Sequence, residues 1–321
     1  MSWSSVLGQP TACAVLRRHL QQQRIAPAYL FTGPEGVGKR LAALEFAKAL
    51  NCEHGTDEAC DQCDACGRIE RGSHPDLHRV SPQGALAMIR VDEVRQVLSR
   101  VGLRPYMGRL QVAIIDGADR LNEEAGNLLL KTLEEPPRRS RFLLLTSQPD
   151  TCLPTIASRC ERVRFAPLAP ALIERLLAAR QVEPSIASAV SRLANGSLSR
   201  AIDLAGGWPS HQEMIAQLGR TDAVAWIEWP VPTEREAVAR WLEGSIEWLR
   251  DVSLAAAGSD ASIRHTHAAS AIRRQAQRWE PEACAAAVIR MVELSESLER
   301  LVSARMVGTL LREQWVQLAA G

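Results

Sequence analysis

The stretch GPEGVGKR, residues 33–40, has the spacing of a phosphate-binding loop. A short apolar segment, AYLFT (28–32), precedes it and predicts a strand, while the Ala- and Leu-rich run LAALEFAKAL (41–50) predicts a helix after it. Glycines let backbone N–H groups point at phosphates, and lysine supplies a point charge. The candidate phosphate-binding residues are therefore Gly33, Gly36, Gly38 and Lys39.

Arg40 departs from this pattern, because a working loop ends in Ser or Thr, whose hydroxyl holds Mg²⁺. An arginine cannot ligate a cation. We therefore expect descent from P-loop nucleotide-binding proteins without present-day hydrolysis. The alternative is a glycine-rich turn between a strand and a helix that never meets a nucleotide.

Asp116 ends the segment LQVAIID (110–116), which predicts a buried parallel strand. P-loop enzymes place the carboxylate that orders Mg²⁺ at such a strand end, and ATPases of the AAA+ type follow it with a Glu that polarises the attacking water. Here the next residue is Gly117, so both the metal and the general base lose a required group. Asp116 as a cap of the following loop is an equally open interpretation.

Length and composition limit the remaining possibilities. A chain of 321 residues predicts two or three domains, and its 46% hydrophobic content is ample for buried cores. The net charge of +1 gives no global attraction to a polyanion. The N-terminal MSWSSVLGQP is polar, and no run approaches the ~20 apolar residues of a membrane span, so we expect a cytoplasmic protein.

Half of the eight cysteines fall in one polar stretch, NCEHGTDEACDQCDACG (51–67). They are Cys52, Cys60, Cys63 and Cys66. Overlapping C-x-x-C pairs predict a structural Zn²⁺ bound by four thiolates, with no position left for a catalytic water. The alternatives to a metal site are a redox dithiol or free thiols. Because the gap after Cys52 is long, His54 or His74 could replace one cysteine as a ligand.

A second well-defined helix and strand lie further along. The run NEEAGNLLLKTLEEPP (122–137) predicts a helix that Asn122 caps and two prolines end. The run RFLLLTS (141–147) predicts another buried strand, whose carboxyl end would face a ligand crevice. Thr146 and Ser147 could sense phosphate there, or they could be ordinary turn residues.

Several motifs together resemble the clamp-loader subunits of bacterial DNA polymerase III, a family of AAA+ proteins. They are GSHPDLHRV (72–80), IRVDEVRQV (89–97), NLLLKTLEEPP (127–137) and SRC (158–160), with the cysteine cluster between the loop and the second strand. The match covers the first 205 residues, and the remainder fits by architecture. It is closer to the non-hydrolysing subunit than to the gamma/tau motor subunits, which keep an intact loop and an Asp-Glu pair.

The resemblance implies roles for two arginines. Arg159 would project across a subunit interface toward the γ-phosphate of ATP held by a neighbouring motor subunit, where such an arginine can be worth ~10³ to 10⁵ in rate. Otherwise Arg159 is an exposed residue in a surface ion pair. Arg200, in GSLSR (196–200), resembles the start of the sensor 2 helix and would face the nucleotide crevice or pair with a carboxylate. Cys160 is expected to be a small buried residue rather than a nucleophile.

The expected fold is an AAA+ P-loop α/β domain with a parallel sheet (1–166), carrying the zinc module (52–66), followed by a small helical lid domain (167–207) and a C-terminal all-helical collar domain (208–321). Seven of the eight tryptophans lie in the last part. They could belong to an oligomerisation collar or to the core of a self-contained bundle. We expect an exposed loop between helices from Gly258 to His267.

The expected function is a stator that helps to place the sliding clamp on primer-template DNA. The resemblance implies gamma/tau and delta subunits as partners, with the clamp and DNA met through the assembly, and it leaves ATP binding doubtful. An active AAA+ ATPase is the main alternative. A zinc-dependent DNA-binding module is disfavoured, because acids in the cysteine cluster would repel phosphate. These acids are Glu53, Asp57, Glu58, Asp61 and Asp64.

Overall fold

The computed structural model describes residues 3–55, 57–83, 88–300 and 302–320. The chain divides into two compact units. The sheet unit contains Met1–Leu176 and Asn195–Arg200, and the helical unit contains Leu177–Ala194 and Ala201–Gly321. The division into three domains at 166 and 207 stays a prediction. Among the described residues, no helix has the length and apolar character needed to cross a membrane.

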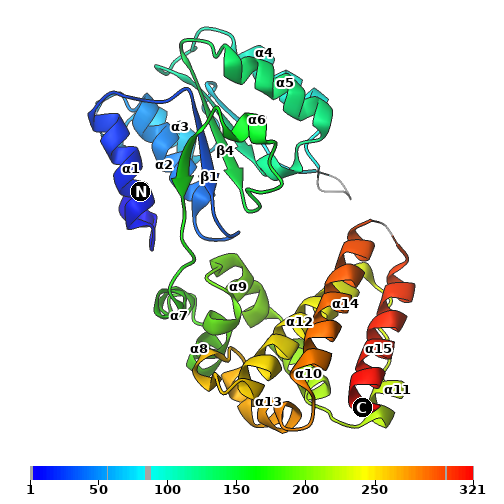
Figure 1. Cartoon of the computed structure of the whole chain (residues 1–321). Helices are drawn as coiled ribbons and strands as arrows, with labels where there is room; N and C mark the ends of the chain where they lie inside the picture. The colour runs from blue at the N-terminus through cyan, green and yellow to red at the C-terminus, as the bar shows by residue number, and fades with distance from the viewer. Residues whose placement is uncertain (1–2, 56, 84–87, 301, 321) are drawn as a thin grey trace. The chain divides into compact units, whose positions relative to one another are not determined.

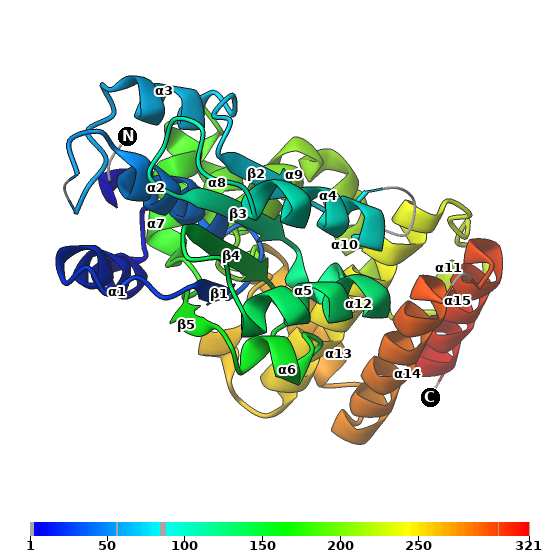
Figure 2. The ribbon, with the colours of Figure 1, turned by 90° about the horizontal axis from the view of Figure 1, so that it is seen from above.

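The sheet unit is built on five parallel strands in the order β2-β3-β4-β1-β5, which are labelled in Figure 2. The strands are β1 (Ala28–Thr32), β2 (Leu77–Val80), β3 (Gln111–Asp116), β4 (Ser140–Thr146) and β5 (Glu161–Arg164). The α/β class with a parallel sheet, predicted from the sequence, is confirmed. β1, which leads into the glycine loop, pairs with β4 and β5.

Helices cover both faces of this sheet (Figures 1 and 2). They are η1 (Trp3–Ser5), α1 (Pro10–Gln21), α2 (Lys39–Asn51), α3 (Asp64–Glu70), α4 (Val91–Val101), η2 (Ala118–Arg120), α5 (Glu123–Glu134) and α6 (Pro154–Ala157). Successive side chains of a strand point to opposite faces. Leu30 therefore packs in the core cluster that includes residues of α4 and α5, whereas Tyr29 meets Phe46 of α2 with ring centroids 5.1 Å apart.

The predicted boundaries of α5 are confirmed. The Asn122 side chain accepts a hydrogen bond from the backbone N–H of Ala125 at 2.9 Å, which satisfies one of the free donors of the first turn. The helix ends at Glu134, just before the two prolines. Two further helices, α7 (Pro170–Ala178) and α9 (Leu198–Gly206), each contain a boundary between the two units.

The helical unit is a bundle with a tryptophan-rich core. Its elements are α8 (Pro184–Leu193), α10 (Trp208–Leu218), α11 (Ala223–Ile227), α12 (Arg235–Ala256), η3 (Asp260–Ser262), η4 (Thr266–Ala268), α13 (Ala269–Ala276), α14 (Pro281–Glu299) and α15 (Ala304–Ala320). Trp226, Trp248 and Trp315 are fully buried, and the rings of Trp226 and Trp315 stack with centroids 4.6 Å apart. These tryptophans therefore belong to the core of the unit itself.

The expectation of an exposed loop from Gly258 to His267 is wrong in part. η3 and η4 lie in this segment, and Ile263 and His265 are buried. The buried carboxylate of Asp251 accepts hydrogen bonds from the backbone N–H groups of Arg264 and His265, each at 2.9 Å, and contacts the His265 ring at 2.8 Å. A polar stretch is thus held against α12 by one acid.

Candidate nucleotide loop and candidate metal centre

The glycine loop has a backbone that only glycine accommodates easily. Gly36 and Gly38 have φ of 71° and 100°, in the left-handed region, and Gly38 caps the start of α2. A Cβ at Gly33 would lie 2.3 Å from the carbonyl oxygen of Phe165. The three glycines of the motif are therefore required by the shape of the loop, whatever the loop binds.

Lys39 is buried and points back into this loop. Its Nζ donates hydrogen bonds to the carbonyl oxygens of Gly33 and Pro34, at 2.6 and 2.7 Å. Burial lowers the pKa of Lys39, and the nearby carboxylates of Asp116 and Glu35 oppose that shift. A phosphate that entered the loop would have to compete with the two carbonyl oxygens for this ammonium group.

Arg40 lies beside the carboxylate at the end of β3. Its Nε is 3.9 Å from Oδ2 of Asp116, and both side chains are partly exposed. Burial raises the pKa of Asp116, whereas the charges of Arg40 and Lys39 lower it. Two cations of the chain itself therefore surround the carboxylate that orders Mg²⁺ in P-loop enzymes.

The residue after this carboxylate could not easily be the catalytic acid of an ATPase. Gly117 has a φ of 97°, and a Cβ there would lie 2.9 Å from Cγ of Pro82. A glutamate would meet both backbone strain and a steric contact. The backbone strain and the contact with Pro82 explain why no acid stands at this position. The sequence alone does not give that reason.

Thr146 is tied into the loops at the carboxyl edge of the sheet. Its hydroxyl donates to Asp119 Oδ1 at 2.6 Å and accepts from the backbone N–H of Gln148 at 3.0 Å. Ser147 is exposed. Thr146 thus has the contacts of a turn residue, and its use as a phosphate sensor stays a prediction.

Ser197 and the first residues of α9 contact the glycine loop, within the sheet unit. The backbone N–H of Leu198 donates to the carbonyl oxygen of Gly36 at 3.1 Å. A Cβ on Gly36 would lie 2.5 Å from Oγ of Ser197 and 2.2 Å from Oγ of Ser199. Sequence reasoning singled out Arg200 here and missed the two serines. The backbone N–H of Arg200 donates to Ser197 Oγ at 3.2 Å, and no observation tests its predicted role.

Arg159 follows α6 and pairs with the end of α5. Its guanidinium donates to Glu134 Oε1 at 2.7 Å and to the carbonyl oxygen of Thr155 at 3.0 Å. The side chain is about a third exposed. In the isolated chain it therefore forms a surface ion pair, from which it could reach a partner only by exchanging Glu134. Burial raises the pKa of Cys160 to about 12, which agrees with a thiol that is not a nucleophile.

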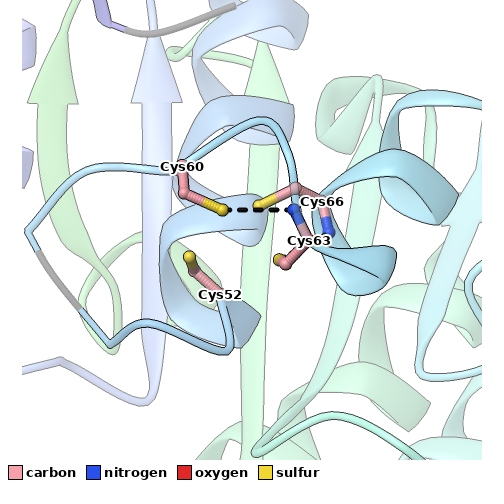
Figure 3. A group of neighbouring side chains, drawn as sticks. All are labelled: Cys52, Cys60, Cys63 and Cys66. Carbon is pink, nitrogen blue, oxygen red and sulfur yellow. Dashed lines mark hydrogen bonds between the residues drawn. The ribbon is translucent and has the colours of Figure 1, made fainter.

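The four clustered cysteines meet where α2 ends and α3 begins (Figure 3). Their sulfur atoms all lie within 4.8 Å of one another. The backbone N–H of Cys63 donates to Cys60 Sγ at 3.3 Å, and that of Cys66 donates to Cys63 Sγ at 3.4 Å. Zn–S bonds of about 2.3 Å place the sulfurs of a tetrahedral site about 3.8 Å apart. The donor set and its spacing fit a tetrahedral metal ion with modest adjustment.

The two histidines considered as ligands lie outside this group of sulfurs in the described part of the chain. His54 is exposed, and hydrogen bonds to Cys60 and Cys52 raise its pKa. His74 is buried, and its Nδ1 accepts a hydrogen bond from the backbone N–H of Asp76 at 3.1 Å. The four thiols are therefore the better candidate ligand set.

Comparison with known proteins identifies the family. Residues 8–169 match the family model described as DNA polymerase III, delta subunit. The chain belongs to this family. It is 38% identical over 197 residues to the DNA polymerase III subunit delta' of Bacillus subtilis, covering 61% of this chain and 59% of that protein. The clamp-loader resemblance of the motifs, with its delta-prime character, is thereby confirmed.

Two further proteins match a larger share of this chain. The chain is 35% identical over 268 residues to the DNA polymerase III subunit tau of Salmonella typhimurium, covering 77% of this chain and 41% of that protein. A solved structure of a gamma subunit-related protein from Thermotoga maritima covers 96% of this chain and 99% of that one, at 16% identity and a TM-score of 0.48. The chain thus spans less than two thirds of the length of the curated relatives named here.

Proposed function

We propose that this chain is the delta-prime type of clamp-loader subunit and that it does not hydrolyse ATP. The observation that carries the proposal is the Arg40 guanidinium beside the Asp116 carboxylate. In an active P-loop enzyme a hydroxyl and a carboxylate at these positions hold Mg²⁺. A positive charge there disfavours a divalent cation, and Gly117 supplies no group to activate water.

The proposed contribution to catalysis is made in trans. Arg159 would stabilise negative charge that develops on the γ-phosphate of ATP held by an adjacent gamma/tau subunit. What supports this is its place in the SRC motif and its partial exposure. The guanidinium would exchange its ion pair with Glu134 for the γ-phosphate when the interface forms.

The proposed setting is a cytoplasmic assembly. Its members would be gamma/tau and delta subunits, which act on the sliding clamp and on primer-template DNA. The helical unit would serve as the collar of that assembly. The Lys39 ammonium of the degenerate loop is bound to the loop's own carbonyl oxygens, so the loop would bind ATP or ADP weakly.

We also propose that Cys52, Cys60, Cys63 and Cys66 hold one structural Zn²⁺. Four thiolates close the shell of a tetrahedral ion, so the metal would order the polar loop and take no part in a reaction. The support is the gathering of the four sulfurs and the two backbone N–H donors aimed at them.

The test of the main proposal is multiple-turnover phosphate release by the purified full chain with ATP and Mg²⁺. We expect no turnover above that of the Lys39→Ala variant, which controls for a contaminating ATPase. The similarity to tau favours an active ATPase as the second candidate. Turnover that survives purification and is lost in Lys39→Ala would establish that candidate and reject the stator.

A further inference from the structure

Two acids between the first and second cysteine of the module reach the N-terminal segment. Glu58 Oε1 accepts from the backbone N–H of Trp3 at 3.3 Å and from Nη2 of Arg17 at 3.2 Å. Asp57 accepts from Nε2 of Gln21 at 2.6 Å through its carboxylate, and from the indole N–H of Trp3 at 3.3 Å through its backbone oxygen. We call Asp57 and Glu58 the clasp. It joins residues more than 35 positions apart in sequence and holds both η1 and α1.

The N-terminal segment in turn holds the glycine loop. Gln9 is buried, and its Nε2 donates to the carbonyl oxygens of Val37 and Ala166, at 3.2 and 2.7 Å. Its Oε1 accepts from the backbone N–H of Ala166 at 2.9 Å. Val37 stands between Gly36 and Gly38, so one side chain connects the start of α1 with the middle of the loop.

The clasp adds polar contacts to the apolar packing of the N-terminal segment. Trp3 and Leu16 are buried, while an open surface pocket of about 640 Å³ lies along residues 3–21. Two of the four clasp hydrogen bonds reach Trp3 of η1, and the other two reach Arg17 and Gln21 of α1. The clasp therefore ties both elements to the module.

The module is also fixed to α2. Lys48 is fully buried, and its Nζ contacts Asp61 Oδ1 at 2.8 Å and Glu70 Oε2 at 2.9 Å. Asp61 lies between two of the cysteines, and Glu70 ends α3. The module is thus anchored to the helix that begins at Lys39 and linked through the clasp to the helix that precedes the loop.

We propose that the clasp residues Asp57 and Glu58 are positioning residues, through which the metal-ordered module fixes the N-terminal segment and, by way of Gln9, the glycine loop. Metal binding orders a loop that has little apolar core of its own. Without that order the carboxylates lose their fixed places, and the hydrogen bonds to Trp3, Arg17 and Gln21 weaken together. This inference rests on the metal binding proposed above.

The test is amide hydrogen exchange of the metal-loaded full chain, with metal content measured on the same samples. Arg17→Ala cuts the clasp from the α1 side, away from the cysteines, and should leave the metal bound. We expect exchange to rise about three- to tenfold in residues 3–9 and 33–38, because charge-assisted hydrogen bonds that restrain local opening are lost. Strand β3 should stay protected. Removing the metal with a chelator should raise exchange in the same two regions as well as in residues 52–66.

Two further variants separate positioning from general destabilisation. Glu58→Gln keeps an oxygen acceptor for the N–H of Trp3 and should restore much of the protection that Glu58→Ala loses. Glu124→Ala removes an exposed acid from the first turn of α5 and should change neither region. The proposal is overturned if Arg17→Ala and Glu58→Ala leave exchange in residues 33–38 unchanged. It is also overturned if chelation raises exchange in residues 52–66 alone. If the chain is purified without bound metal, the metal proposal itself is wrong.

Discussion

At the scale of single residues, Gly117 explains why exchanging Arg40 alone should not restore an ATPase. Arg40→Thr would return a hydroxyl beside Asp116, but the backbone at Gly117 has a φ of 97° and Pro82 blocks a side chain there. The proposed loss of hydrolysis would therefore have a cause in the backbone as well as in one side chain. A glycine loop with the right spacing could be recognised in the sequence, whereas this second obstacle could not.

We predict that Gly117→Glu lowers the free energy of unfolding by about 1–2 kcal/mol, because a non-glycine residue is strained at this φ and meets Pro82. Chemical denaturation of the full chain measures this. Gly206→Ala is the matched control, since a Cβ there has no atom within 4 Å, and it should change stability little. The double variant Arg40→Thr, Gly117→Glu is expected to remain without turnover in a phosphate-release assay. A stability equal to that of the wild type would show that Pro82 moves aside.

At the scale of elements, the loop between α4 and β3 depends on one buried acid. The carboxylate of Asp76 accepts from the backbone N–H groups of Tyr106, Met107 and Gly108, at 2.7, 2.9 and 2.7 Å. Burial raises the pKa of Asp76, but these three donors outweigh it and hold the pKa below its ordinary value. The ionised form is therefore favoured in the folded chain.

This lowered pKa predicts a pH dependence of stability. A carboxyl whose pKa is lower when folded contributes stability above its unfolded pKa of about 3.9, and that contribution disappears as pH falls through the folded pKa. Asp76→Asn should cost about 2 kcal/mol at pH 7. The difference between wild type and variant should shrink below pH 4, as measured by urea denaturation across pH. A difference that stays constant down to pH 2 would mean that the charge of Asp76 contributes nothing.

The four-cysteine module gives a second prediction for an element. Cys63 caps α3 and accepts the backbone N–H of Cys66, so Cys63→Ser should remove one ligand and release the metal. We expect about one Zn²⁺ per wild-type chain by elemental analysis and little in the variant. Unfolding should begin earlier in residues 52–70, with the helical unit nearly unaffected. Cys160→Ser, outside the module, should retain the metal.

The sequence predicted the features that depend on residues close together in the chain and missed those that depend on residues far apart. Strands β1, β3 and β4, the cap Asn122 and the cysteine cluster follow from local patterns, and all were placed correctly. The acids of the module were interpreted only as groups that repel phosphate, yet Asp57, Glu58 and Asp61 bind the N-terminal segment and α2. Partners so distant in sequence leave no periodic pattern. The same limit explains the error at His265, which Asp251 holds in the interior.

At the scale of the whole molecule, composition marked the C-terminal part as different without revealing what the tryptophans do. Trp226, Trp248 and Trp315 fill the core of the helical unit, so a collar must use other residues. Ile289 and Val292 on α14 are exposed, one helical turn apart. A partner helix could cover this apolar surface. The collar therefore stays a proposal, and the tryptophans do not support it.

The decisive prediction for the assembled protein concerns Arg159. Arg159→Ala should leave the isolated chain folded, because its ion pair with Glu134 is partly exposed and such pairs contribute about 0–1 kcal/mol. In a loader reconstituted with gamma/tau and delta subunits, the same change should slow clamp- and DNA-stimulated ATP hydrolysis by about 10³-fold or more, since the neighbouring ATP would lose a cation at its γ-phosphate. Arg159→Lys should rescue poorly, because an ammonium lacks the planar set of donors of guanidinium.

The matched control is Glu134→Gln, which removes the charge that holds Arg159 in the isolated chain but leaves the arginine present. We expect its effect on turnover to be far smaller than that of Arg159→Ala. Subunit binding, measured by sedimentation of the assembled complex, should be nearly equal for all variants, because the arginine is expected to act on the transition state and not on assembly. A loader that assembles with Arg159→Ala and hydrolyses ATP at the wild-type rate would make Arg159 a surface residue, and the stator would then act through its shape alone.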